Sequence, residues 1–454
     1  MWTSAALTAL ACATMTNSSN ALPELSIEKY KLENGLTVIL HHDSRLPLVA
    51  VNVWYDVGAR HEREGLSGFA HLFEHMMFQG SLHVGEDKHF SYLQAAGATG
   101  INGTTSFDRT NYFQTVPKNY LELALWLESD RMGFLLDTLT EKSLQNQIEV
   151  VQNERRQSLE NRPYGLMNEM ITQTLYPKPH PYYGNIIGSM KDIAAATLDD
   201  VREFFRTYYT PANASLVIAG DFDPKTIKAT VEKYFGSLKG RQKPAPVVID
   251  APPIKSEILK RFDEPVGKLS KLSMTWMGPN SYADDTADLD VLSHIISGTK
   301  SSRLDRKVSF EDQLAQSVTA YFSETMSGSQ FRIEIVLRPG RTPEEAHKAI
   351  DEVLKKFESQ PITQAEVARA QNSVESTMVR GLEKLGGFSG RADLLQRYNL
   401  FLGSPDKLAW DLSRFRKTTP KSVTNALKKY LTKNRLIVYA TPSKKTATAE
   451  EAKQ

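Results

Sequence analysis

The sequence contains a single cysteine, carries almost no net charge and has only one short run of apolar residues, at its N-terminus. Lys and Arg number 55 against 53 for Asp and Glu, so no basic excess favours nucleic acid or an anionic membrane surface. No later segment is apolar for 18 residues, so we expect a soluble mature chain without a membrane span. The hydrophobic content of 41% excludes a disordered chain, and 454 residues suffice for two to three domains.

The N-terminal segment has the character of a secretory leader. Residues 2–15 are apolar but too few to cross a bilayer, which takes about 20 residues, and Ser19-Asn20-Ala21 offers the small residues that signal peptidase accepts. We therefore expect a signal peptide over 1–21, cleaved near Ala21, although a basic n-region is absent. Since Cys12 lies within it, the mature chain would lack thiol catalysis, Cys-bound zinc and disulfides, as suits a periplasmic protein. Lipoprotein anchoring at Cys12 is the less favoured alternative.

Two parts of the chain repeat one order of strands and helices on either side of a proline-rich segment. Hydrophobic periods of 2 and 3.6 residues distinguish strands from helices. In the first part they predict strands over 31–40, 49–57, 111–116 and 214–219, and helices over 65–79, 119–136 and 141–160. We predict an α+β fold of two similar halves. The ranges are 22–238 for the N-terminal domain, 239–265 for a linker, 266–445 for the C-terminal domain and 446–454 for a polar tail.

One five-residue motif, His71-Leu72-Phe73-Glu74-His75, carries most of the chemical information. Residues i and i+4 of a helix share a face, so His71 and His75 can bind one metal ion, and neutral imidazole is a good zinc ligand. The carboxylate of Glu74, next to a ligand, can hold a metal-bound water. The arrangement is the zinc motif H-E-x-x-H in reverse order. The alternative is a helix whose two histidines are only structural.

Two histidines leave a zinc site one protein ligand short. His83 and His89 are close in sequence, but both lie in a charged segment that is more typical of a solvated loop. The helix predicted over 141–160 is the better source, because it presents the carboxylates of Glu149, Glu154 and Glu160.

Four segments of the chain match a known family in their joint order. They are residues 65–81, which contain the histidine motif, and residues 100–104, 150–156 and 161–165. With these segments the chain resembles the pitrilysin/insulinase-type zinc metallopeptidases, and within them the short-chain branch that is similar to the mitochondrial processing peptidase. The resemblance covers essentially the whole mature chain.

The resemblance implies a zinc-dependent endopeptidase that hydrolyses peptides or unfolded polypeptide segments. One Zn²⁺ per chain would be bound by His71, His75 and Glu154, and Glu74 would be the general base that activates a zinc-bound water. Asn102 and Gly103 would lie on a strand that pairs with extended substrate at the edge of the cleft. The implied fold is two similar α/β-roll domains in tandem, each an antiparallel-rich sheet packed with helices, which form half of a clam-like chamber.

The chain departs from the family pattern at two places. A second glutamate, two helical turns before the ligand glutamate, is replaced by Gln147, which can hydrogen-bond but brings no charge. The Arg and Tyr that grip the substrate from the other half of the active site correspond to Ser309 and Gln316. The resemblance therefore implies a companion chain that carries the Arg/Tyr pair in a heterodimer, with a homodimer as the alternative.

A second function is compatible with the resemblance. Catalytically silent members of this fold act as structural or scaffold subunits, and these have typically lost part of the zinc motif. All four residues that the family uses at the metal are present here: His71, Glu74, His75 and Glu154. Their presence favours the peptidase.

Overall fold

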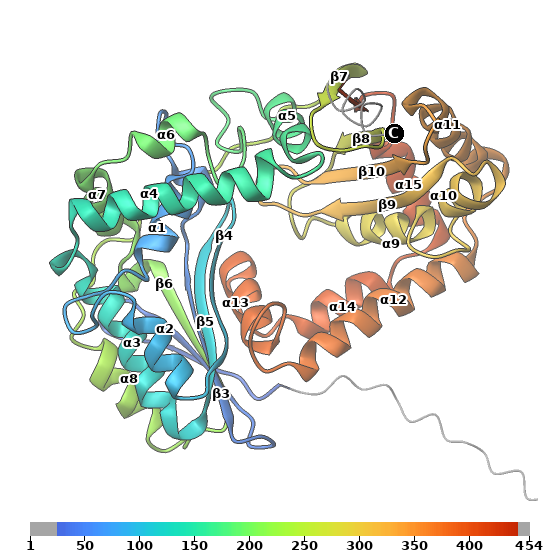
Figure 1. The fold of residues 1–454 in the computed structure, drawn as a ribbon. Coiled ribbons are helices and arrows are strands. Elements are labelled where there is room, and N and C mark those ends of the chain that lie inside the picture. Colours follow the sequence, from blue (N-terminus) through green and yellow to red (C-terminus); the bar gives the residue numbers. More distant parts are fainter. Residues whose placement is uncertain (1–24, 444–454) are drawn as a thin grey trace, which may run out of the picture.

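A computed structural model describes residues 25–443 of the chain as two sheet-and-helix halves that lie side by side (Figure 1). The predicted signal peptide, Cys12 and the predicted polar tail lie outside the described residues. Within residues 25–443, no helix combines the length and the apolar character that crossing a lipid bilayer requires.

The two sheets share one topology, which confirms the predicted α+β fold of two similar halves. The first sheet has the order β1-β2-β6-β3-β5-β4 and the second the order β7-β11-β8-β10-β9. In each sheet, one parallel pair (β2 with β6, β7 with β11) is followed by antiparallel neighbours. The last of these neighbours, β4 or β9, forms the edge of its sheet. The strands are β1 (Glu28–Lys31), β2 (Thr37–His42), β3 (Leu48–Tyr55), β4 (Thr99–Thr105), β5 (Thr110–Pro117), β6 (Ala214–Gly220), β7 (Ile258–Glu264), β8 (Lys271–Met277), β9 (Ala315–Ser323), β10 (Gln330–Leu337) and β11 (Leu436–Pro442).

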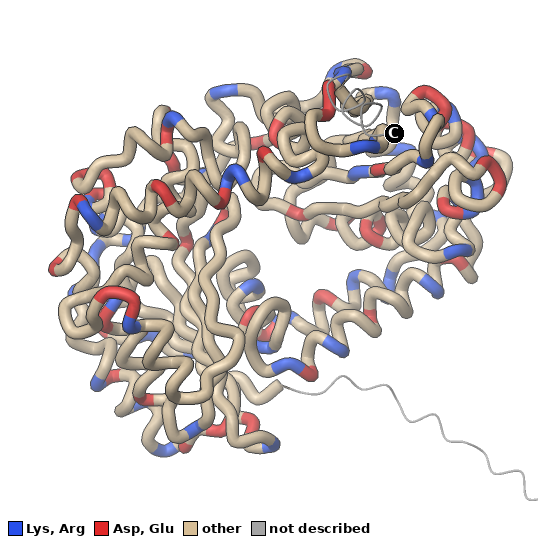
Figure 2. The backbone as a smooth tube through the Cα atoms, in the orientation of Figure 1, with Lys and Arg blue, Asp and Glu red and all other residues tan. Residues whose placement is uncertain are grey.

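The strands of the first sheet that position the site carry no charged residue. β3 and β6 read LVAVNVWY and ASLVIAG and are buried on both faces, as central strands between two layers require. β4 and β5 are equally free of Lys, Arg, Asp and Glu, so the charges of this half lie mainly on its helices and loops (Figure 2).

Helices cover both sheets. In the first half they are α1 (Phe69–Met76), α2 (Lys88–Ala95), α3 (Leu121–Phe134), α4 (Glu141–Arg155), α5 (Gly165–Leu175), α6 (Met190–Ala194), α7 (Leu198–Tyr208) and α8 (Ile227–Phe235). In the second half they are α9 (Thr286–Ile296), α10 (Arg303–Asp305), α11 (Pro343–Ser359), α12 (Gln364–Glu383), α13 (Arg391–Leu402), α14 (Leu408–Arg416) and α15 (Pro420–Tyr430). The helix predicted over 141–160 is α-helical to Arg155 and continues as a π-helical turn to Glu160.

The halves exchange one helix each. Helix α5 belongs to the first half in sequence, but its Met167 and Ile171 pack against Val438 of the second sheet. Helix α13 belongs to the second half, yet its Ala392 and Leu395 pack against the first sheet. No single cut of the chain therefore separates the two packing units.

The boundary between the halves also differs from the predicted linker over 239–265. Residues 239–257 contain neither helix nor strand, but 258–264 form β7, which pairs with β11 throughout its length. Four of the seven residues of β7 are charged, so hydrophobic periodicity does not predict this strand.

A buried carboxylate joins the two halves. Asp108, in the turn between β4 and β5, accepts hydrogen bonds from the side chains of Arg60 (3.2 Å) and Tyr182 (2.5 Å). It also accepts from the backbone N–H of Met326 in the β9–β10 turn, at 3.3 Å. The junction thus couples the β4–β5 turn to the second sheet.

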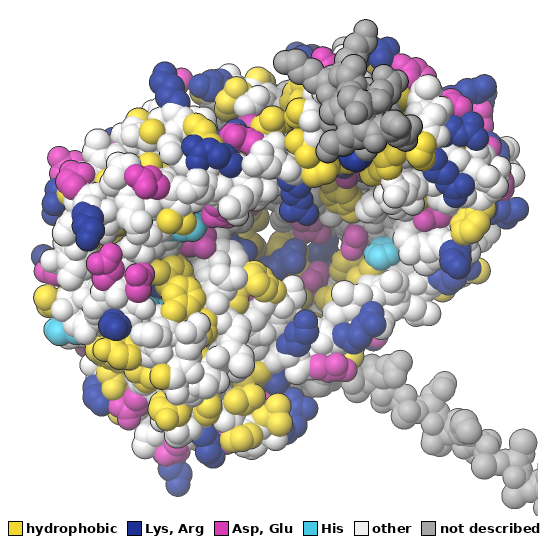
Figure 3. Space-filling model, viewed as in Figure 1, with side chains coloured by type: hydrophobic (Ala, Val, Ile, Leu, Met, Phe, Trp, Pro, Cys, Tyr) yellow, Lys and Arg dark blue, Asp and Glu magenta, His cyan; other side chains and the backbone are white. Residues whose placement is uncertain are grey.

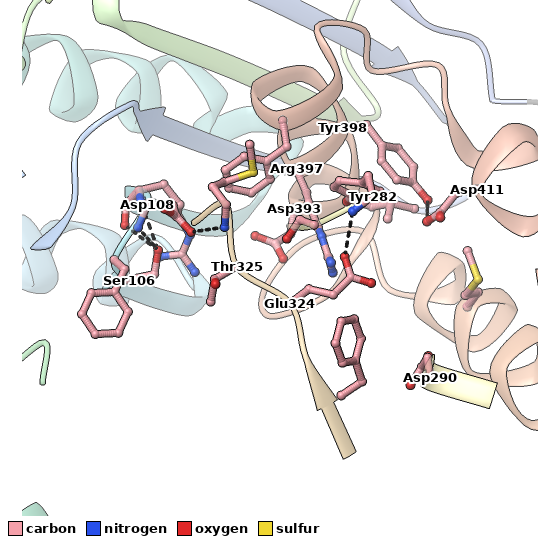
Figure 4. A pocket seen from close by; sticks show the side chains of 18 of the residues that line it. Ser106, Asp108, Tyr282, Asp290, Glu324, Thr325, Asp393, Arg397, Tyr398 and Asp411 are labelled. Carbon is pink, nitrogen blue, oxygen red and sulfur yellow. Dashed lines mark hydrogen bonds between the residues drawn. The ribbon is translucent and has the colours of Figure 1, made fainter. Parts of the chain in front are cut away.

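A central cavity of about 720 Å³ lies between the halves. The space-filling view shows this hollow with acidic and basic side chains around it (Figure 3). Its wall includes Glu324 next to the second sheet and Asp393 and Arg397 on α13, and Glu324 accepts a hydrogen bond from the backbone N–H of Tyr282 at 3.3 Å (Figure 4).

The helix exchange predicts that a substitution in the second half destabilises the first sheet. Leu395 is fully buried against that sheet, so Leu395→Ala should lower the free energy of unfolding by about 2–5 kcal/mol in urea titrations. Amide hydrogen exchange should then speed up in β3 and β6. The control Leu46→Ala, at a side chain that is 58% exposed, should change stability by less than about 0.5 kcal/mol. If the amides of β3 and β6 stay as well protected as in the wild type, α13 does not stabilise the first sheet.

Candidate metal centre

Two helices and an edge strand converge on a cluster of three side chains. α1 supplies His71 and His75, α4 supplies Glu154, and β4 lies against α1. One ligand atom from each of the three residues lies within 4.8 Å of the others. In residues 25–443, no other set of three or more His, Cys, Asp or Glu side chains has this spacing. The structure therefore brings together the three residues that the resemblance implies as metal ligands.

The distances within the cluster fit a zinc ion. Oε2 of Glu154 lies 3.3 Å from Nε2 of His75 and 3.8 Å from Nε2 of His71. Ligand atoms bound tetrahedrally at about 2.0–2.1 Å from one zinc ion are about 3.3 Å apart. Two imidazole nitrogens and one carboxylate oxygen are also the donor set of a catalytic zinc site with an open fourth position.

Gln147, the first departure from the family pattern, lies directly behind the cluster. Its Oε1 is 3.3 Å from Nδ1 of His75, and its side chain is almost fully buried. A carbonyl oxygen only accepts, so Nδ1 of His75 would donate to Gln147, and Nε2, on the side of Glu154, would be the atom that binds a metal ion. An uncharged amide thus orients this ligand.

The two histidines differ in their pKa values: despite its burial, the hydrogen bond to Glu154 raises the pKa of His75, whereas the pKa of His71 is lowered. The largest influence on the pKa of His71 is its burial, with the neighbouring His75 adding to it, and together they lower that pKa to about 4. Nδ1 of His71 is buried without a hydrogen-bond partner in the part of the chain that the structure describes. A neutral imidazole is the form that binds metal.

Glu74 lies beside the cluster, pressed against the edge strand. Its side chain is 8% exposed, and its Oε2 accepts a hydrogen bond of 2.6 Å from the hydroxyl of Thr105. A Cβ atom on Gly103 would lie 3.0 Å from Oε1 of Glu74, so only glycine leaves this carboxylate its place. Burial raises the pKa of Glu74 above its usual value, although the Thr105 hydrogen bond opposes the shift.

The cluster opens into a cavity of about 710 Å³. The wall of this cavity contains every residue that the sequence analysis assigned to metal, catalysis or substrate: His71, Glu74, His75, Asn102, Gly103 and Glu154. Asn102 is exposed there, and its Oδ1 accepts a hydrogen bond from the backbone N–H of Gly103 at 2.9 Å. Among the strands that the structure describes, β4 pairs only with β5, so its other edge is free of them and open to an added strand.

The other candidate ligands have different surroundings. Nδ1 of His83 is bonded to Asp130 at 2.5 Å, and His89 packs against the rings of Phe78 and Phe90. Glu160 accepts a hydrogen bond from Arg155 at 3.1 Å. None of these belongs to the cluster.

The second half of the chain contributes nothing to the cavity at the cluster. Among the described residues, those that line it all lie between His71 and Ile187. Ser309 lies in the π-helical turn Arg306–Glu311, where its carbonyl accepts a hydrogen bond from Arg338, and Gln316 is an exposed residue of β9. Neither side chain lines the cavity.

Thr105 is a site residue that the sequence analysis missed. Its position three residues after Asn102 is the only signal, because the contact to Glu74 arises from the packing of α1 on β4. The role of Gln147 at His75 could be anticipated only from the family pattern.

Comparison with known proteins places the fold and the cluster in a family. The model for insulinase (peptidase family M16) matches residues 37–181, and the model described as the peptidase M16 inactive domain matches residues 195–374. The chain belongs to the M16 peptidase family.

Several relatives are named as zinc proteases. Zinc protease PqqE of Helicobacter pylori is 29% identical over 369 residues, which cover 80% of this chain and 82% of PqqE. The uncharacterized zinc protease YmxG of Bacillus subtilis is 26% identical over 357 residues, which cover 79% of this chain and 85% of YmxG.

Solved structures agree with the fold. The crystal structure of a protease from Helicobacter pylori matches with a TM-score of 0.85 at 26% identity, over 92% of this chain and 100% of the other. The periplasmic protease PqqL from Escherichia coli matches with a TM-score of 0.77 at 16% identity, over 94% of this chain but only 49% of PqqL. At that identity the second likeness concerns the fold alone.

The contact between Gln147 and His75 predicts an effect on metal affinity. Gln147→Ala removes the acceptor that orients the imidazole, so zinc should bind about 10- to 100-fold more weakly in a chelator competition. Gln145→Ala, an exposed position on the same helix, is the matched control and should leave the affinity unchanged. Equal affinities for the two variants would refute the role of Gln147.

Proposed function

We propose that the protein is a zinc-dependent endopeptidase that hydrolyses peptides or unfolded polypeptide segments. The observation that carries this proposal is the convergence of His71, His75 and Glu154 beside a buried Glu74, at the free edge of a strand. A structural subunit would need neither the ligand set nor a carboxylate held in this position.

Each residue at the site has a role in the proposed reaction. His71, His75 and Glu154 would hold a zinc ion, which acidifies water and polarises a carbonyl group. Glu74 takes the proton from the attacking water and passes it to the leaving amine. Its raised pKa makes it a stronger base, and Thr105 fixes one carboxylate oxygen so that Oε1 is free to accept the proton.

The edge of β4 would bind the substrate. An extended peptide can add to the free edge through main-chain hydrogen bonds, which do not depend on sequence. Asn102 and Gly103 then lie beside the scissile bond, because Gly103 touches Glu74. Only an unfolded segment can supply a strand of this kind.

We further propose that a second chain completes the chamber. Support comes from the cavity at the cluster, which receives no residue from the second half, and from Ser309 and Gln316 at the positions of the family's Arg and Tyr. A companion chain with that pair is the favoured partner, and a second copy is the alternative. The native mass and subunit composition of the protein from its own source distinguish two chain types from one.

We also propose export to the periplasm. The apolar residues 2–15, the small residues at 19–21 and the absence of cysteine from the rest of the chain support it. An N-terminus at Leu22 in the protein recovered from the periplasm is the expected result, and a retained Met1 would contradict it.

The proposed role of Glu74 predicts a separation of metal binding from catalysis. Glu74→Gln keeps the size of the side chain but removes the base, so cleavage of internally quenched peptides should fall about 10²- to 10⁴-fold. The zinc content should stay at one ion per chain. Glu149→Gln, at an exposed position of α4, should retain full activity. Normal activity of Glu74→Gln would refute the general base.

The contact between Gly103 and Glu74 predicts a second effect on catalysis. A methyl group at Gly103 displaces the carboxylate by a few tenths of an ångström, and Gly103→Ala should lower kcat about 10- to 100-fold while zinc stays bound. Gly85→Ala is the control, since a Cβ there meets only Lys88, at 3.4 Å. A kcat equal to that of the wild type would show that the contact does not constrain the base.

A further inference from the structure

The loop between α12 and α13 presents one aromatic ring to the first sheet. Its sequence over 385–390 is Leu-Gly-Gly-Phe-Ser-Gly. The side chain of Phe388 is 60% exposed, and its ring meets the buried ring of Phe113 on β5 edge-to-face, with 5.1 Å between centroids. A single exposed phenylalanine is unremarkable in itself, so the support for a function comes from how and where it is held.

The loop is held rigidly at both ends. The backbone N–H groups of Arg391 and Ala392 donate to the carbonyls of Lys384 and Leu385, at 2.9 and 3.1 Å. A Cβ atom on Gly386 would overlap the hydroxyl of Thr115, so the backbone lies directly on the sheet.

The residue after Phe388 has a strained backbone. Ser389 has a φ of +58°, in the left-handed region that residues with a side chain rarely adopt. Its N–H donates to Asp393 at 3.2 Å, which helps to hold it there. These contacts hold the loop backbone beside the sheet, where the ring of Phe388 contacts Phe113.

This position is on the face of the sheet that carries Asn102. Phe113 lies opposite Asn102 in the β4–β5 pair, and opposite residues of neighbouring strands share a face. Trp54, on the same face, lines the central cavity. Gly103 points to the other face, toward Glu74.

The loop and the catalytic residues meet opposite ends of β4. Glu74 touches Gly103 and Thr105, whereas a Cβ on Gly100 would lie 3.9 Å from Cα of Gly387. Three residues of strand span about 10 Å. The loop backbone thus meets β4 three residues from Gly103. The ring of Phe388 contacts Phe113, which lies opposite Asn102, so a peptide added along β4 would pass the ring within about three residues of its scissile bond.

We infer that Phe388 and Phe113 form an apolar subsite for an extended peptide, which binds a hydrophobic side chain within about three residues of the scissile bond. The inference rests on the proposed peptidase function. Main-chain pairing along β4 accepts any sequence, so selectivity must come from side-chain contacts of this kind. Covering the ring of Phe388 with a Leu or Phe side chain removes apolar surface from water, which is enough for about a tenfold preference.

The test is the cleavage profile of the protein as assembled in its native host. A mixture of unfolded peptides is digested, and mass spectrometry identifies the residues around every cut that requires both zinc and Glu74. Wild-type cuts should be enriched about tenfold for Leu, Ile, Met or Phe at one position within three residues of the cut, on one side only. Phe388→Ser should lose this enrichment, and Phe388→Leu should keep most of it.

Two controls make the outcome decisive. Phe310→Ala removes an equally exposed ring in the π-helical turn of the second half and should leave the profile unchanged. Zinc content should be the same in all variants. An unchanged profile in Phe388→Ser would overturn the subsite alone. Absence of any cleavage that depends on zinc and Glu74 in the wild type would overturn the proposed function, and the subsite with it.

Discussion

The approach of Glu74 to the backbone of Gly103 is the constraint on which the site depends. Because Gly103 has no side chain, helix α1 can lie against the edge strand closely enough for the Glu74 carboxylate to reach the hydroxyl of Thr105. The same approach places His71 and His75 opposite Glu154 of α4. Metal ligands, base and strand edge thus occupy one small region because a single backbone position has no Cβ.

The second half of the chain shows what the same architecture becomes without this chemistry. Helix α9 packs beside the edge strand β9, as α1 packs beside β4. α9 contains one histidine, His294, and buries Leu289, Leu292 and Ile296 in the core instead of presenting a ligand pair. The first half carries the metal cluster. The second half contributes α13, which packs against the first sheet.

Local patterns in the sequence predict those parts of the structure that depend on near neighbours. The spacing of His71 and His75 and the periodicity over 119–136 are of this kind, and the structure has that helix, α3, within two residues at each end. Strand β7 was hidden because its charged residues are tolerated on an edge strand whose partner, β11, lies almost at the other end of the chain. The helix exchange is hidden for a related reason: an amphipathic pattern does not say which sheet it covers.

The residues of the site also fall into those that local sequence patterns predict and those that they do not. The helical motif predicts the histidine pair, but Glu154 could be chosen from three carboxylates only through the family resemblance, and the structure brings that one to the cluster. Thr105 and Phe388 acquire their surroundings from contacts across 31 and 275 positions of sequence, to Glu74 and Phe113 respectively. No local rule carries information over such separations.

The free edge of β4 has a consequence for the protein's own colloidal behaviour. Exposed strand edges normally invite two folded molecules to join their sheets and to polymerise. Here the edge lies inside a concavity, and its sequence, TGINGTT, contains two glycines and an asparagine, which strands disfavour. A single flexible chain can enter such a recess, whereas the sheet of a neighbouring molecule is too bulky to do so. The edge of β4 thus stays open to a substrate strand without causing folded molecules to polymerise.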